Sequence, residues 1–79
     1  LGPQERLRPG FIWVPLDIAN IHGIAVLTSI ITLTPGTVSA SLSDDRRHLL
    51  VHVLHLEDPE ALVQEIKARY EAPLMEIFP

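Results

Sequence analysis

A strict alternation of apolar and polar residues predicts one half-buried strand near the middle of the chain. From 37 to 43, Val38, Ala40 and Leu42 share one face, and only threonine and serine occupy the other. A period of two is typical of a strand with one face in water. A charged turn follows, and the valine- and leucine-rich segment 48–56 predicts a second strand. We therefore expect an antiparallel hairpin with Val38, Ala40 and Leu42 facing helices.

Two elements are expected before this hairpin. Aromatic and β-branched residues at 11–16 predict a short strand, with Pro15 at a strand end or an edge because it has no amide hydrogen. Apolar residues at helical spacing over 18–33 predict a helix that Asp17 caps and that is buried on much of its circumference. This run is also uncharged, which raises a membrane span as an alternative. It is dotted with polar residues and shorter than the roughly 20 apolar residues that a span needs, so a buried helix is favoured.

The segment between this helix and the hairpin predicts a type II turn. Thr34-Pro35-Gly36-Thr37 places proline, whose φ is preset, at the second position and glycine at the third. The third position of this turn requires a positive φ, which glycine adopts without strain. We therefore expect Gly36 to have a positive φ.

The last predicted element is a helix after residue 58. Asp58 is expected to cap it, and Pro59 suits its first position. Its apolar face carries Leu62, Val63, Ile66 and Tyr70, and its other face carries Gln64, Glu65, Lys67, Arg69 and Glu71, which we expect to be solvated. Pro73 is expected to end or kink the helix near Ala72, leaving an apolar tail. The predicted order is β-α-β-β-α, a small α+β domain with an antiparallel hairpin and two helices packed on the sheet.

Composition and charge narrow the class of protein. The chain has 79 residues, 47% of them hydrophobic, which suits one small folded domain. It has no cysteine, so disulfides and thiolate metal sites are excluded. A net charge of −4 and only four aromatic residues argue against a nucleic-acid surface.

Few residues of the sequence are arranged in a way that is typical of a catalytic or metal-binding site. His48 and His52 would share a strand face, but ~13 Å would separate them at about 3.3 Å per residue, which is too far for one metal ion. The chain has no nucleophile elbow and no glycine-rich phosphate loop. We therefore predict no catalytic residue, no metal site and no cofactor, and a protein that is not an enzyme.

A surplus of large apolar side chains suggests a partner surface. The candidates for a subunit interface are Phe11, Trp13, Leu74, Met75, Ile77 and Phe78. A domain this small can bury only a limited number of large side chains, and exposed apolar patches often mark partner sites. The alternative is that these residues pack within the domain itself.

Four short motifs, in order, resemble one known family. They are the turn Thr32, Leu33, Thr34, Pro35, Gly36 and Thr37, the pair Val51-His52, the segment Glu57-Asp58-Pro59-Glu60, and Ile66-Lys67-x-Arg69-Tyr70-Glu71. Together they are similar to the E subunit of the multisubunit cation/proton antiporters of the Mrp or Mnh type. The likeness extends from about 8 to 78, and Pro73 departs from it because the family usually continues its helix there.

The resemblance implies an organisation and a function. The E subunit of this family has N-terminal membrane helices followed by a small cytoplasmic domain. Residues 1–10, which carry prolines, glycines and a slight positive charge and do not begin with methionine, are then expected to be a linker from a removed membrane region. Residues 11–79 would be the cytoplasmic domain of an accessory or assembly subunit in the cell membrane.

The implied partners are the other subunits of a complex that exchanges Na⁺ or K⁺ for H⁺. The membrane would be reached through the missing N-terminal region. An alternative stays open from the element order alone: a freestanding small regulatory or ligand-binding α+β domain that dimerises through its sheet.

Overall fold

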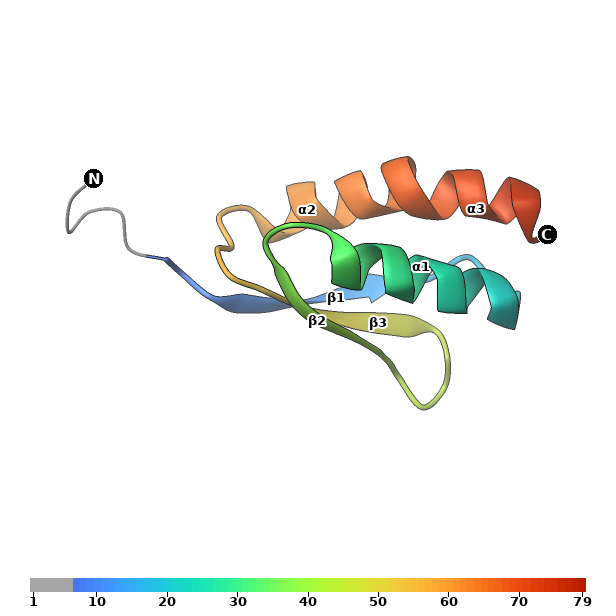
Figure 1. Cartoon of the computed structure of the whole chain (residues 1–79), viewed down its shortest axis with the longest axis horizontal. Coiled ribbons are helices and arrows are strands. Elements are labelled where there is room, and N and C mark those ends of the chain that lie inside the picture. Colours follow the sequence, from blue (N-terminus) through green and yellow to red (C-terminus); the bar gives the residue numbers. More distant parts are fainter. Residues whose placement is uncertain (1–6) are drawn as a thin grey trace.

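The computed structural model describes residues 7–79, so the first six residues of the predicted linker lie outside the described part. The elements are β1 (Gly10–Pro15), α1 (Ile21–Leu33), β2 (Thr37–Leu42), β3 (His48–Val53), α2 (Pro59–Ile66), the π-helical turn η1 (Lys67–Glu71) and α3 (Ala72–Ile77). The last three form one continuous helical rod (Figure 1). The predicted order and the α+β class are confirmed.

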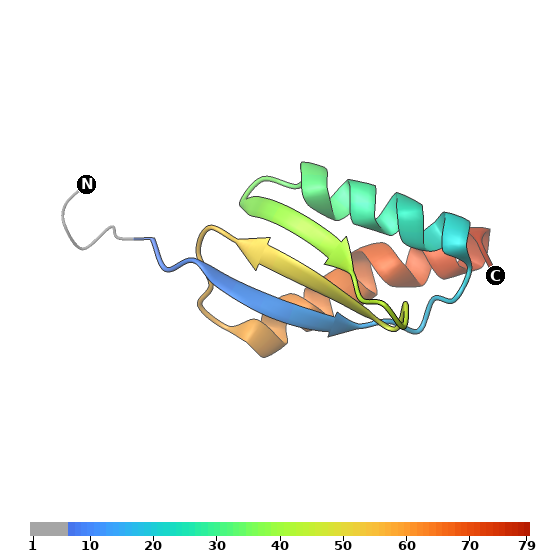
Figure 2. The same cartoon turned by 90° about the horizontal axis from the view of Figure 1, so that it is seen from below.

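The sheet has three antiparallel strands in the order β1-β3-β2, which places β3 in the centre. The helices lie on one side of it, as Figure 1 shows. Figure 2, seen from below, shows the strands in front and the helical rod behind them. One face of the sheet is therefore covered by helices, and the other face is open.

The predicted hairpin is confirmed, with one error at its start. The pairing runs from Thr37 with Val53 to Ser39 with His52, so Val38 is an extra residue in a β-bulge. A bulge sets two residues against one and interrupts the alternation of side chains. Val38 is therefore 48% exposed instead of facing the helices, whereas Ala40 packs against the core as expected.

The start and the burial of α1 also differ from the prediction. Its N-cap is Asn20, whose side-chain oxygen accepts hydrogen bonds from the backbone N–H groups of His22 and Gly23 at 2.9 and 3.3 Å. Only one stripe of α1, centred on Leu27, is buried, and Ile21 is 49% exposed. The expected burial around much of the helix is wrong because α1 packs on the sheet and against the C-terminal helix with one side only, and its opposite side stays exposed.

The turn after α1 confirms the sequence prediction. Gly36 has a φ of +92°, and the Thr37 N–H donates to the Thr34 carbonyl at 3.1 Å. A Cβ on Gly36 would meet nothing within 4 Å. Glycine is therefore required by the backbone conformation and not by lack of space.

The C-terminal helix begins as predicted but continues past Pro73. Asp58 Oδ1 accepts from the Ala61 N–H at 3.1 Å, and Pro59 occupies the first turn. Before Pro73 the helix widens, and the Ala72 N–H donates to the Lys67 carbonyl five residues back. Proline clashes with the carbonyl four residues before it in a regular α-helix, and the wider π turn relieves that clash. Of the two outcomes expected near Ala72, an end or a kink of the helix, the end is therefore wrong.

The core fills the space between the covered face of the sheet and the helices. Its fully buried side chains include Val14 from β1, Leu27 and Ile31 from α1, and Leu49 and Val51 from β3. Because the helix continues past Pro73, Leu74 also reaches this core, and Phe78 packs against it.

Candidate functional site

The open face of the sheet carries the largest side chains of β1. Phe11 is 61% exposed and Trp13 is 55% exposed. The Phe11 ring stacks on the His52 ring with centroids 4.2 Å apart and planes inclined by 15°. The Trp13 ring meets the His48 ring edge-on at 6.2 Å. Each of the two aromatic side chains thus contacts a histidine ring of the central strand.

This arrangement follows from the strand register. Phe11 lies directly opposite His52, and alternate residues of β1 point to opposite faces. Ile12 and Val14 are therefore buried under the helices, while Phe11 and Trp13 face outward. We call the surface formed by Phe11, Trp13, Ser39, Ser41, His48, Leu50 and His52 the open face.

A groove borders the open face along the free edge of β1. It lies between β1 and the first turns of α2, with a volume of about 490 Å³, and Trp13, Val63 and Gln64 are among its lining residues. The accessible apolar surface therefore continues from the sheet onto the side of α2.

The other interface candidates lie in two different environments. Met75 and Ile77 are 37% and 66% exposed on α3, away from the core. Leu74 is only 7% exposed and belongs to the core, and Phe78 is partly buried against it. The structure therefore does not bring the six candidates together, and the proposed contact through Leu74 needs correction because a partner cannot reach this side chain.

A buried ion pair that the sequence analysis missed joins the C-terminal helix to the loop before α1. Glu71 is 2% exposed, and its Oε1 lies 2.8 Å from Lys67 Nζ. Its Oε2 accepts hydrogen bonds from the backbone N–H groups of Asp17 and Ile18 at 2.7 and 3.1 Å. Lys67 also lies 2.9 Å from the Asp17 carboxylate and donates to the Pro15 carbonyl. The Asp17 side chain is 71% exposed, so only the Glu71 end of this cluster is fully buried. We call Lys67, Glu71 and Asp17 the clamp.

The charge of Lys67 is favoured within this clamp. Partial burial alone would lower the pKa of Lys67, but hydrogen bonds to Glu71 and Asp17 outweigh the loss of hydration and raise the pKa above its usual 10.5. The sequence contained a signal for this pair, since Lys67 and Glu71 are four residues apart and share one side of a helix. Asp17, expected as an N-cap, is a clamp residue instead.

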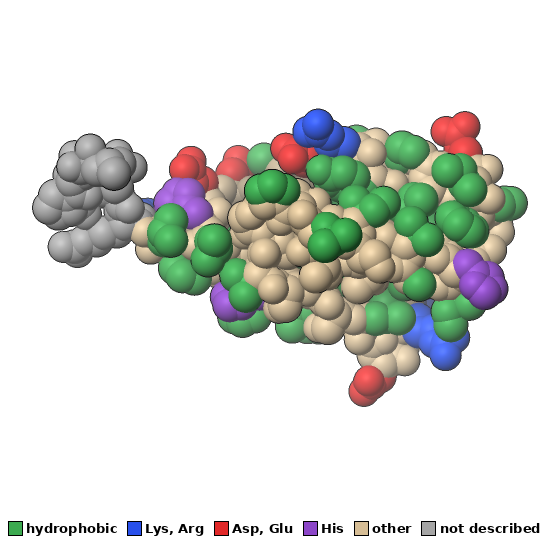
Figure 3. All heavy atoms as spheres, in the orientation of Figure 1, with side chains coloured by type: hydrophobic (Ala, Val, Ile, Leu, Met, Phe, Trp, Pro, Cys, Tyr) green, Lys and Arg blue, Asp and Glu red, His purple; other side chains and the backbone are tan. Residues whose placement is uncertain are grey.

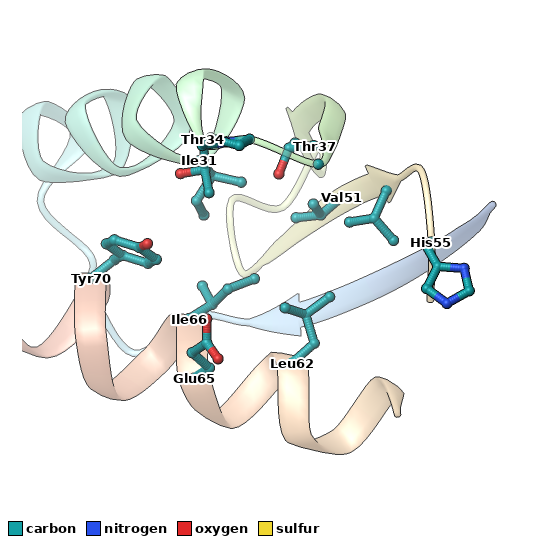
Figure 4. A pocket seen from close by; sticks show the side chains of 12 residues that line it. Ile31, Thr34, Thr37, Val51, His55, Leu62, Glu65, Ile66 and Tyr70 are labelled. Carbon is teal, nitrogen blue, oxygen red and sulfur yellow. The ribbon is translucent and has the colours of Figure 1, made fainter. Parts of the chain in front are cut away.

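A cavity of about 170 Å³ lies beneath the turn between α1 and β2 (Figure 4). Its walls are mainly apolar, and Figure 4 shows Ile31 of α1 and Ile66 of α2 pointing toward one another across it. Thr34, Thr37 and Tyr70 add polar atoms to its lining. The two motifs 32–37 and 66–71 thus meet at one cavity, although they lie far apart in the sequence.

A second groove continues from this cavity toward the start of α2. The two share His55, Leu62 and Glu65, and the second also has Glu57 and Asp58 in its lining. His55 Nδ1 accepts a hydrogen bond from the Arg8 N–H at 3.1 Å, so its proton is on Nε2, which donates to Glu57 at 2.8 Å. The carboxylates therefore lie at the rim of an apolar depression.

No histidine cluster with metal-ligand geometry is seen in the part of the chain that the structure describes. His48 and His52 lie on the open face as expected, and within residues 7–79 no group of three or more potential ligands is placed to hold a metal ion. In the same range, no helix has the length and apolar character required to cross a bilayer.

Comparison with known proteins gives a consistent result. A family model described as a Na⁺/H⁺ ion antiporter subunit matches residues 1–77. The E subunit of the Na⁺/H⁺ antiporter of Bacillus subtilis is 34% identical over 77 residues, 98% of this chain and 49% of the relative. The corresponding subunit of Alkalihalophilus pseudofirmus is 30% identical over 77 residues, and the E1 subunit of Staphylococcus haemolyticus is 35% identical over the same length. The chain spans about half the length of these relatives.

Proposed function

Because the chain belongs to the family of Na⁺/H⁺ antiporter E subunits, we propose that it is the cytoplasmic domain of an accessory subunit in a multisubunit monovalent cation/proton antiporter. In this proposal, residues 1–10 link the domain to a membrane region, and residues 11–79 hold other subunits in place. The domain supports assembly and does not itself carry ions.

The observation that carries this proposal is the open face. Phe11 and Trp13 leave large apolar surfaces in water although the same strand buries Ile12 and Val14. Aromatic side chains dominate the binding energy of many protein interfaces, and these two are already held by ring contacts with His52 and His48. Side chains that already make ring contacts lose less conformational freedom when a partner covers them than side chains that make none.

The expected partner is another subunit of the antiporter. Covering one aromatic side chain fully would contribute about 1.5–3 kcal/mol to association. Met75 and Ile77 on α3 provide a second, separate apolar contact in the same proposal.

The test uses the full-length subunit in its complex. Trp13→Ser and Phe11→Ser should reduce the amount of the other subunits that copurify with it, while its own amount in the membrane stays unchanged. Val26→Ser is the control, since Val26 is a 36% exposed apolar residue on the helical side. Unchanged copurification in both aromatic variants would contradict the proposal.

The alternative, a freestanding domain that dimerises through its sheet, would use the same open face. Sedimentation of the isolated chain distinguishes the two. A dimer that Trp13→Ser dissociates, together with unchanged copurification in the full-length protein, would favour the alternative.

A further inference from the structure

Three segments of the chain are tied together at one end of the domain. The Leu54 N–H donates to the Gly36 carbonyl at 2.8 Å, and the Leu56 N–H donates to the Arg8 carbonyl at 2.8 Å. The turn after α1, the loop after β3 and the segment leading into β1 therefore meet here, at the N-terminal end of the domain in Figure 1. The cavity of Figure 4 and the groove that continues from it open at this end.

This surface, which we call the turn groove, combines an apolar hollow with an acidic rim. The hollow measures about 170 Å³, and an apolar cavity of roughly 150 Å³ is enough to admit a benzene-sized group. The rim carries Glu57, Asp58 and Glu65, and within residues 7–79 no lysine or arginine lines either part of the groove. Two cations lie nearby, Arg8, whose backbone contacts His55, and Arg69, which lies over the Tyr70 ring. Figure 3 shows acidic side chains and a histidine gathered at this end.

We propose that the turn groove binds a short basic segment from a cytoplasmic loop of another antiporter subunit, with one large apolar side chain in the hollow and lysine or arginine on the rim. This inference rests on the proposed function. If residues 1–10 lead to the membrane, the turn groove is at the membrane-proximal end of the domain. Cytoplasmic loops of membrane proteins carry an excess of lysine and arginine close to their membrane helices, which complements the carboxylates of the rim.

In this proposal, the turn at 32–37 forms one wall of the binding site. Gly36 sets the shape of the turn, and its neighbours Thr34 and Thr37 line the hollow. The Thr34 hydroxyl donates to the Ile30 carbonyl at 2.8 Å, so this hydroxyl does not offer its proton to the hollow. The turn therefore forms a fixed wall against which an inserted side chain can pack.

The test is site-specific photocrosslinking in the intact complex. A photoreactive phenylalanine analogue replaces Ala61, an exposed residue that lines the groove, and in a control it replaces Ala68, which is exposed and lies outside the groove. After digestion, mass spectrometry should identify a product between position 61 and a lysine- or arginine-bearing loop of another subunit, with a much lower yield from position 68. A product with an acidic segment, a product within the same chain, or equal yields at both positions would overturn the proposal.

A charge reversal tests the rim in the same complex. Glu65→Lys should reduce the position-61 product about fivefold or more, as expected when attraction at an exposed ion pair becomes repulsion. Glu76→Lys makes the same change at an exposed site on α3 and should leave the product unchanged. If the complex copurifies intact but Glu65→Lys has no effect, the groove proposal fails while the proposed function stands. If the other subunits do not copurify at all, the proposed function fails.

Discussion

The two faces of the sheet use the same strands in opposite ways. On the covered face, Val14, Leu49 and Val51 have no exposed surface, and all three are aliphatic. On the open face, the neighbouring residues include Phe11 and Trp13, which are more than half exposed. A sheet face that only meets water usually carries polar residues. The covered face therefore stabilises the fold, whereas the open face leaves aromatic surface accessible, as the proposed subunit contact requires.

Alanine substitutions at two adjacent leucines test whether the two faces of the sheet contribute differently to stability. Leu49 is fully buried on the covered face, and Leu50 follows it on the open face. Leu49→Ala should lower the free energy of unfolding by about 2–5 kcal/mol because it leaves a cavity. Leu50→Ala should lower it by less than about 1 kcal/mol. Chemical denaturation of both variants checks this, and equal losses would show that the two faces do not differ.

The clamp extends the comparison, because its Glu71 carboxylate is a charged group buried on the covered side of the sheet. Glu71→Gln removes the charge opposite Lys67 and should lower the free energy of unfolding by about 1.5–3 kcal/mol. Glu65→Gln is the matched control on the exposed side of the same helical rod and should change it by less than about 0.5 kcal/mol. Denaturation curves of the two variants that coincide would mean that the clamp does not stabilise the fold.

A substitution in the turn between α1 and β2 is expected to change the free energy of unfolding by a smaller amount. Gly36→Val places a β-branched side chain at a φ of +92° and should cost more than about 1 kcal/mol of unfolding free energy. Thr32→Val, on the exposed surface of α1 near the turn, serves as the control. If thermal denaturation gives both variants the same midpoint, the backbone argument is wrong.

Alkaline pH should lower the free energy of unfolding because the clamp loses the charge of Lys67. This is the smallest of the expected effects. The pKa of Lys67 is raised on folding, so its contribution to stability is fully present below the usual lysine pKa of 10.5 and is lost as the pH rises through the higher folded value. The loss should be absent in Lys67→Met. Unfolding followed from about pH 9 to about pH 12 tests this, and equal slopes in both proteins would exclude the clamp as the cause.

Much of the fold was predictable because its signals are local. The hairpin, the type II turn and the Asp58 cap each depend on a few consecutive residues whose backbone preferences agree. The bulge at Val38 was not predictable, because alternation in the sequence continues through it while the pairing with β3 does not. Asn20 displaced Asp17 as the cap because a residue 54 positions away, Glu71, holds the Asp17 backbone in a loop.

The candidate sites show the same division. The sequence alone identified Phe11 and Trp13 as interface candidates, and strand alternation places both on one face. Which face stays open depends on where the helices pack, and strand alternation does not determine that. Leu74 was nominated on the assumption that Pro73 ends the helix. The π turn removes that assumption, since it carries the helix past Pro73 and delivers Leu74 to the core.

The π turn also affects how the chain tolerates changes in length. An α-helix advances about 100° per residue, so one inserted or deleted residue rotates everything beyond it by that angle. The turn at Lys67–Glu71 already holds one residue more than α geometry needs, as its hydrogen bond across five residues shows. Deleting Ala68 and replacing Pro73 with alanine, which removes the clash that the π turn relieves, would return this turn to α geometry and preserve the phase of α3. The same deletion within α2 would rotate Ile66 out of the core. If related chains whose C-terminal helices differ in length by one residue are aligned, the gap should therefore fall at Lys67–Glu71.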